Sequence, residues 1–194
     1  MRPLIPSPSQ TIGPFFHFAL DRPEWSDLTA DGATGEKIYI EGRVLDGNRA
    51  PVADALLEIW QANAVGRYDH PEDTQDKPLD PKFRGFGRAS TGADGSYRFT
   101  TIRPGPVPGR GNTMQAPHIN LTVFARGLLN RLVTRIYFAD EPSNATDPVL
   151  SAIEDPMVQR TLLAERKGGG AKHPVAYAFD IVLQGDGETA FFDI

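Results

Sequence analysis

Residues 114–127, MQAPHINLTVFARG, place an imidazole and a carboxamide two positions apart in a stretch with strand periodicity. The alternate positions 119, 121, 123 and 125 are apolar, whereas His118, Asn120 and Thr122 are polar. Because successive strand residues point to opposite faces, His118 and Asn120 share a face that the core does not use. This face is part of a metal site, the remnant of one, or an ordinary hydrated sheet face, and the spacing alone leaves these alternatives open.

Other metal-binding groups are few. The chain has no cysteine, which excludes thiolate ligands, cysteine nucleophiles and disulfides, so a metal would need His, Asp, Glu or Tyr. The remaining histidines, His17, His70 and His173, are scattered along the chain, which is typical of surface or structural residues. His118 is therefore the best single candidate for site chemistry.

Charged residues offer a second kind of chemistry. The carboxylates of residues 68–81, YDHPEDTQDKPLDP, lack the alternating spacing of a calcium loop, and the run favours a solvated loop. Arg126 ends the predicted strand that carries His118, and Arg135 lies on the next one. Either guanidinium could hold a carboxylate with two parallel hydrogen bonds, or could form a weak surface ion pair.

Composition limits the classes of protein. A chain of 194 residues is long enough for one domain with a proper core, and its net charge of −5 argues against a nucleic-acid binder. No apolar run approaches the ~18 residues of a membrane span, and the N-terminus lacks a signal pattern, so we expect a cytoplasmic protein. The 19 glycines and 17 prolines favour a turn-rich, all-β fold.

The elements that must position these residues are mostly short strands. Alternation and turn signals predict strands within residues 37–46, 53–62, 87–102, 117–126, 131–140 and 175–185, with a hairpin across 127–130. One helix is expected over residues 155–167, with Asp155 as N-cap and Pro156 in its first turn. We therefore expect a β-sandwich that carries its site on two long loops, residues 63–87 and 104–117.

The first 36 residues form a separate segment. Residues 1–36 are rich in Pro, Ser and Gly yet contain Phe15, Phe16, Phe18 and Trp25, and disordered tails rarely keep so many aromatic residues. We expect an N-terminal arm that docks on its own domain or on a partner, followed by the β-sandwich domain, residues 37–194.

Five segments resemble the intradiol ring-cleaving dioxygenases as an ordered set. They are EIWQANAVGRYDH (58–70), PLDPKFRGFGR (78–88), DGSYRFTTIRPGPVP (94–108), APHINLTVFARG (116–127) and YAFDIVLQGDGETAFFD (177–193). The resemblance runs from about Thr11 to the C-terminus and implies a β-sandwich. It also implies a chemistry in which a mononuclear non-heme ferric ion, held by two tyrosines and two histidines, activates a catecholate for attack by O2.

The ligand pattern of that family is only half present. The resemblance places the tyrosine ligands at Tyr68, which is kept, and at Val107, which is not a donor. It places the histidines at His118, which is kept, and at Asn120, which replaces one. Gln115 stands where catalytic chains carry an arginine. Since two donors cannot hold Fe(III), we expect this chain to bind no metal and to contain no catalytic residue when alone.

The same resemblance extends to the α subunits of two-chain members of the family. It implies a related β subunit that holds the Fe(III), an (αβ)n hetero-oligomer, and O2-dependent cleavage of protocatechuate to 3-carboxy-cis,cis-muconate. This chain would wall the pocket over the partner's iron with Thr11, Gly13, Pro14, Phe15 and Arg126. Two alternatives remain: a scaffold subunit with a degenerate metal site, and, disfavoured by the missing donors, a lone iron dioxygenase.

Overall fold

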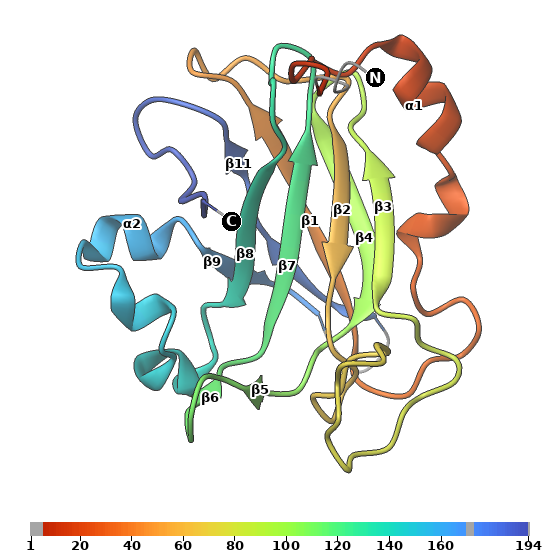
Figure 1. Ribbon diagram of the computed structural model, residues 1–194, viewed down its shortest axis with the longest axis vertical. Helices are drawn as coiled ribbons and strands as arrows, with labels where there is room; N and C mark the ends of the chain where they lie inside the picture. The colour runs from red at the N-terminus through yellow and green to blue at the C-terminus, as the bar shows by residue number, and fades with distance from the viewer. Residues whose placement is uncertain (1–5, 170–172, 194) are drawn as a thin grey trace, which may run out of the picture.

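The computed structural model describes residues 6–169 and 173–193, and these form a β-sandwich (Figure 1). Helix α1 (Pro14–Leu20) and the short η1 (Pro23–Ser26) precede the first strand, and η2 (Pro142–Thr146), η3 (Leu150–Ala152) and α2 (Pro156–Arg160) follow the eighth. The strands are β1 Lys37–Leu45, β2 Leu56–Trp60, β3 Phe86–Ser90, β4 Ser96–Ile102, β5 Val107–Pro108, β6 Met114–Gln115, β7 His118–Phe124, β8 Leu132–Phe138, β9 Leu163–Lys167, β10 Val175–Ala178 and β11 Ile181–Val182.

One continuous set of strand pairs builds both layers. The order is β11-β1-β10-β9-β8-β7-β2-β3, with β4 paired to β1, while β5 and β6 form a separate small ribbon. Strands β2, β3, β7 and β8 form one layer, β1, β4 and β10 lie behind it, and β9 pairs with a strand of each layer (Figure 1). The predicted hairpin of β7 and β8 is present, and the predicted all-β sandwich is confirmed.

The core lies between the two layers and follows strand periodicity. Its fully buried members come from both sheets, among them Ile38, Ile40, Ile59, Phe99, Ile119, Leu121, Val123, Ile136 and Phe138. Along β7 the buried apolar residues alternate with the polar ones, so His118 and Asn120 do lie on the face away from this core. The periodicity therefore assigned the faces of β7 correctly.

The predicted helix over residues 155–167 is wrong in its second half. Helix α2 spans only Pro156–Arg160, and Leu163–Lys167 is strand β9. The start is as expected, because the Asp155 side chain accepts a hydrogen bond of 2.8 Å from the Met157 N–H. Residues 163–167 are extended because β9 pairs its backbone with both β8 and β10. This pairing overrides the local helix propensity.

The N-terminal segment is more ordered than its composition suggests. Helix α1 was not predicted, and it rests on the sheet through the Phe16 ring, 5.5 Å from the ring of Phe124. The Thr11 hydroxyl accepts a hydrogen bond of 2.7 Å from the Gly127 N–H. By contrast, Phe15 and Phe18 are 84% and 80% exposed, so this part of the segment leaves aromatic surface uncovered.

The connections gather at opposite ends of the sandwich. The loop between β2 and β3 and the loop that carries β5 and β6 emerge together at one end, whereas α1 and the β7–β8 turn lie toward the other (Figure 1). We call these the loop end and the arm end. The described α-helices have seven and five residues, and none of the described helices could cross a membrane.

Candidate functional site

A hollow of about 580 Å³ opens at the loop end, within the range of small-molecule pockets. The two long loops and strands β7 and β8 form it together. It is lined by Trp60, Tyr68, His70, Glu72, Asp73, Thr74, Gln75, Val107, Pro108, Gln115, His118 and Arg135. Three of the four family ligand positions, Tyr68, Val107 and His118, thus line one cavity, and the fourth, Asn120, is hydrogen-bonded to Tyr68.

His118 is held in one orientation at the floor of this hollow. The residue is only 3% exposed, and its Nδ1 lies 2.7 Å from the Ala116 carbonyl oxygen. Since a carbonyl can only accept, Nδ1 carries the proton, and the Nε2 lone pair is left free. Burial, together with the nearby charge of Arg135, lowers the pKa of His118 to about 4, so the ring is neutral at pH 7.

Asn120 and Tyr68 are hydrogen-bonded to each other, and both contact Trp60. The Asn120 amide donates to the Tyr68 hydroxyl at 3.3 Å and to the Trp60 carbonyl at 3.2 Å. The Tyr68 ring stacks on Trp60 with centroids 5.8 Å apart, and burial raises the pKa of its hydroxyl. In this chain the Tyr68 phenol is therefore protonated at neutral pH.

Arg135 is the pocket residue whose importance the sequence reasoning missed. Its Nη1 donates to Gln115 at 2.6 Å and to the Tyr137 hydroxyl at 3.2 Å, which places a guanidinium beside His118 and Tyr68. Arg135 pairs directly with Asn120 across the β7–β8 hairpin, so both side chains lie on one face. Extending the predicted hairpin in register would have placed Arg135 here.

These residues do not fit a ferric ion. Val107 is buried and offers no donor atom, while Asn120 uses its amide nitrogen in bonds within the chain. The nearby cation of Arg135 further opposes a metal ion. Across the described residues, no group of three or more His, Asp or Glu side chains is arranged to hold a metal.

The carboxylates of residues 68–81 serve the loop itself. Asp73 accepts from the Tyr68 and Gln75 N–H groups, and Asp80 accepts from those of Thr34 and Lys82. The other three, Asp69, Glu72 and Asp76, are exposed.

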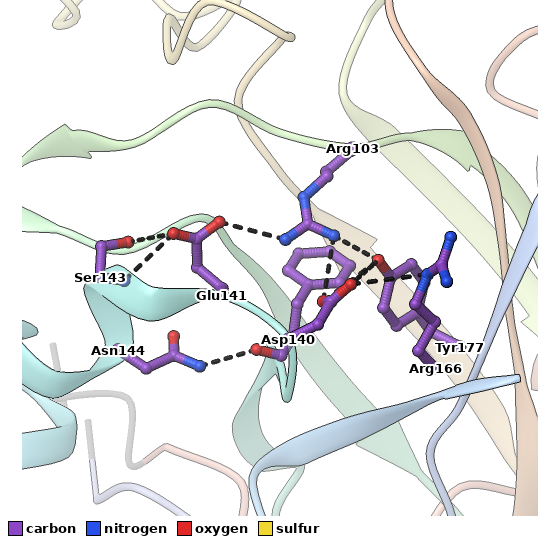
Figure 2. A network of polar contacts seen from close by, with 8 residues as sticks. Arg103, Asp140, Glu141, Ser143, Asn144, Arg166 and Tyr177 are labelled. Carbon is purple, nitrogen blue, oxygen red and sulfur yellow. Dashed lines mark hydrogen bonds and ion pairs between the residues drawn. The ribbon is translucent and has the colours of Figure 1, made fainter.

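A charged network anchors the base of the second loop, which starts just after β4 (Figure 2). Arg103 contacts Asp140 at 3.3 Å, Glu141 at 3.1 Å and the Tyr177 hydroxyl, and its guanidinium lies 4.6 Å from the Phe138 ring centre. Arg166 adds a longer contact of 3.6 Å to Asp140. The network joins β4, β8, β9 and β10 next to the segment that carries Val107.

The predicted pocket-wall residues lie at the arm end instead. Thr11 bonds to Gly127, directly after Arg126, so the arm and Arg126 are brought together. Gly13 and Phe15 are exposed, and Pro14 opens α1, although its side chain is outside what the structure describes. Arg126 lies eight positions after His118, just beyond the end of β7 at Phe124, so the two are at most roughly 26 Å apart at ~3.3 Å per residue. The two sets of candidate residues therefore form two distinct sites.

Arg126 is held by one ion pair. Its Nε lies 3.0 Å from Asp54 Oδ2, and its side chain is 76% exposed. The other carboxylate oxygen of Asp54 is buried and has no hydrogen-bond partner among the described residues. The guanidinium is thus tethered at its base and available to solvent.

Comparison with known proteins agrees with this geometry. A family model described as Dioxygenase matches residues 13–185. The chain is 43% identical to the protocatechuate 3,4-dioxygenase alpha chain of Pseudomonas putida, over 98% of each chain. It is 44% identical to the protocatechuate 3,4-dioxygenase beta chain of Burkholderia cepacia, over 93% of this chain and 77% of that one.

A solved structure shares the fold over nearly the full length. The dioxygenase domain of a dioxygenase–carbohydrate-binding protein fusion from Streptomyces sp. SirexAA-E has a TM-score of 0.63 and 29% identity, covering 95% of this chain and all of that chain. From the strands, the pocket and these matches together, the chain belongs to the intradiol dioxygenase family.

Proposed function

We propose that this chain is the α-type subunit of an intradiol protocatechuate 3,4-dioxygenase and takes part in O2-dependent cleavage of protocatechuate to 3-carboxy-cis,cis-muconate. The observation that carries the proposal is full-length similarity to alpha chains of that enzyme combined with a family ligand site that cannot hold iron. The chain is an enzyme subunit that needs a second chain for chemistry.

The α-type assignment does not depend on percent identity. Identity to an alpha chain and to a beta chain is nearly equal, at 43% and 44%. The match covers 98% of the alpha relative and 77% of the beta relative. The α-type assignment rests on the lost donors at Val107 and Asn120, and the iron is accordingly assigned to a related β subunit.

The arm end supplies this chain's part of the shared pocket. Residues 1–36 dock on the β subunit, where the exposed Phe15 and Phe18 become buried. Thr11 and the backbone of Gly13 and Pro14 then form the pocket wall. Arg126, exposed and tethered to Asp54, attracts the carboxylate of protocatechuate.

The first test measures iron and turnover in the chain alone and after assembly with a β subunit. We expect the purified chain to bind no stoichiometric iron, to lack the visible tyrosinate-to-iron band and to be inactive, and the αβ complex to show all three properties. Iron near one per isolated chain, with activity, would contradict the proposal and support a lone dioxygenase.

The second test separates pocket wall from scaffold. In the αβ complex, Arg126→Ala should raise KM for protocatechuate about tenfold or more and leave assembly intact, because a charge-assisted contact is lost. Arg131→Ala is the matched control, since Arg131 is also exposed and lies near the same hairpin. Unchanged KM and kcat in Arg126→Ala would contradict a role of Arg126 in the pocket and would support the alternative, a scaffold subunit.

A further inference from the structure

The hollow at the loop end keeps a free hydrogen-bond acceptor. His118 Nε2 has no hydrogen-bond partner among the described residues, because the ring is fixed by the bond from Nδ1 to Ala116. His118 as a whole residue is 3% exposed, and it contributes to the lining of the hollow. A buried, oriented acceptor of this kind suits a ligand that brings a hydroxyl or N–H donor.

The same hollow keeps a cation whose charge is not paired. Arg135 uses only Nη1, in neutral bonds to Gln115 and Tyr137, and forms no ion pair with any residue in the described ranges. The carboxylate nearest in the network, Asp147, is reached through the Tyr137 hydroxyl and already accepts from backbone N–H groups. The Nε and Nη2 donors of Arg135 are left to bind a planar anion.

Aromatic and aliphatic groups form the walls of the hollow. The stacked rings of Trp60 and Tyr68, the buried Val107 and the neighbouring Pro108 make up the apolar part of the lining. Asp73 is occupied by the Tyr68 and Gln75 N–H groups, and Glu72 is exposed. The lining therefore combines flat apolar surfaces, the His118 acceptor and the Arg135 guanidinium with Gln115 and the polar side chains of residues 70–75, among them the carboxylates of Glu72 and Asp73, in about 580 Å³.

We infer that this hollow is a metal-free binding site for a small aromatic carboxylate that also carries a ring hydroxyl. The carboxylate binds Arg135, the ring lies between the apolar walls, and the hydroxyl donates to His118 Nε2. The inference rests on the proposed function in one respect, that this chain holds no iron. It adds a second aromatic-acid site per αβ unit, at the end of the chain opposite to Arg126.

The test uses 3-fluoro-4-hydroxybenzoate and the assembled αβ enzyme, followed by fluorine NMR. A probe molecule at the partner's ferric ion gives a strongly broadened signal, because the ion is paramagnetic. A molecule in the hollow of this chain is expected to give a second, sharp bound signal, and Arg135→Gln should weaken that binding about tenfold or more. The matched control, Arg131→Gln, should retain it.

Two further measurements keep the result interpretable. Val107→Trp fills the hollow without removing Arg135 and should also abolish the sharp signal, while the broadened signal reports that the assembly is intact. The uncharged 4-fluorophenol should not compete for the sharp signal. A single, broadened class of bound probe, or a sharp signal that survives both Arg135→Gln and Val107→Trp, would overturn the inference. Stoichiometric iron in this chain would instead overturn the proposed function.

Discussion

The loop end and the arm end of this sandwich differ in where their side chains find partners. At the loop end, Asn120 bonds to Tyr68 and Trp60, and the Arg103 network ties the loop base to four strands. At the arm end, residues 11–20 contact the sandwich through the Thr11–Gly127 hydrogen bond and the Phe16–Phe124 ring contact, and two phenylalanines of this stretch are more than three-quarters exposed.

This difference supports the proposal that the arm end binds another chain. Large apolar side chains exposed side by side on one short helix are typical of an interaction surface. The loop end, although it contains the remnant of the family's metal site, satisfies most of its polar groups internally. Under the proposed function, the ligand positions of the family therefore do not mark the place where this chain contributes to catalysis.

The largest expected effect is on assembly. The double substitution Phe15→Ser and Phe18→Ser should weaken binding to the β subunit roughly a hundredfold or more, because burying each phenylalanine contributes about 1.5–3 kcal/mol. Sedimentation of the αβ mixture measures this. Met157→Ser is the control, since Met157 is 65% exposed on α2, away from the arm. Undiminished assembly of the double variant would place the interface elsewhere.

The Arg103 network tests how firmly the loop end is built. Arg103→Met should lower the free energy of unfolding by about 2–3 kcal/mol, because Asp140 and Glu141 lose their shared cation in a partly buried site. Arg98→Met is the control, since its ion pair with Glu41 is exposed and worth less than about 1 kcal/mol. If urea unfolding gave equal losses of unfolding free energy for the two variants, the network would stabilise the fold no more than an exposed ion pair does.

The buried His118 predicts a specific acid sensitivity. Because its pKa is lowered to about 4 in the folded chain, the unfolded chain binds the proton more tightly, so stability is full above pH ~6.5 and falls as the pH decreases toward 4. By pH 4.5 the loss due to this residue should be about 2 kcal/mol. His118→Asn should lack that part of the pH dependence in urea unfolding, and identical profiles would contradict a buried neutral imidazole.

The smallest effect concerns the tether of Arg126. Asp54→Asn should raise KM for protocatechuate only about two- to fivefold at unchanged kcat, because an exposed ion pair contributes up to about 1 kcal/mol. Glu154→Gln, another exposed acid, serves as the control. A change in kcat rather than KM would show that Asp54 acts on something other than the position of Arg126.

Strand alternation was sufficient to predict the sandwich, the β7–β8 hairpin and the faces of β7. It failed at residues 163–167, where the apolar pattern of the helix continued past α2. These residues form a strand because they pair with β8 and β10. Periodicity carries no information on such long-range partners. The start of α2 was predictable because Asp155 and Pro156 act locally.

The site was less accessible to such reasoning. Tyr68 and His118 are fifty residues apart, and only the family resemblance suggested that they meet. The sequence left open whether Arg135 holds a carboxylate or forms a surface ion pair, because its register opposite Asn120 was not followed through. The exposure of Phe15 and Phe18 depends on how α1 settles on the sheet, which local sequence does not determine.

Strand β7 carries His118 at one end and leads to Arg126 beyond the other, at most roughly 26 Å away. Substitutions at that separation, with no shared contacts, add nearly independently. Loss of the metal donors at one end of the strand would therefore leave the proposed pocket wall at the other end undisturbed. The near-equal identity of this chain to an alpha and a beta relative fits two related subunits of which one holds the metal.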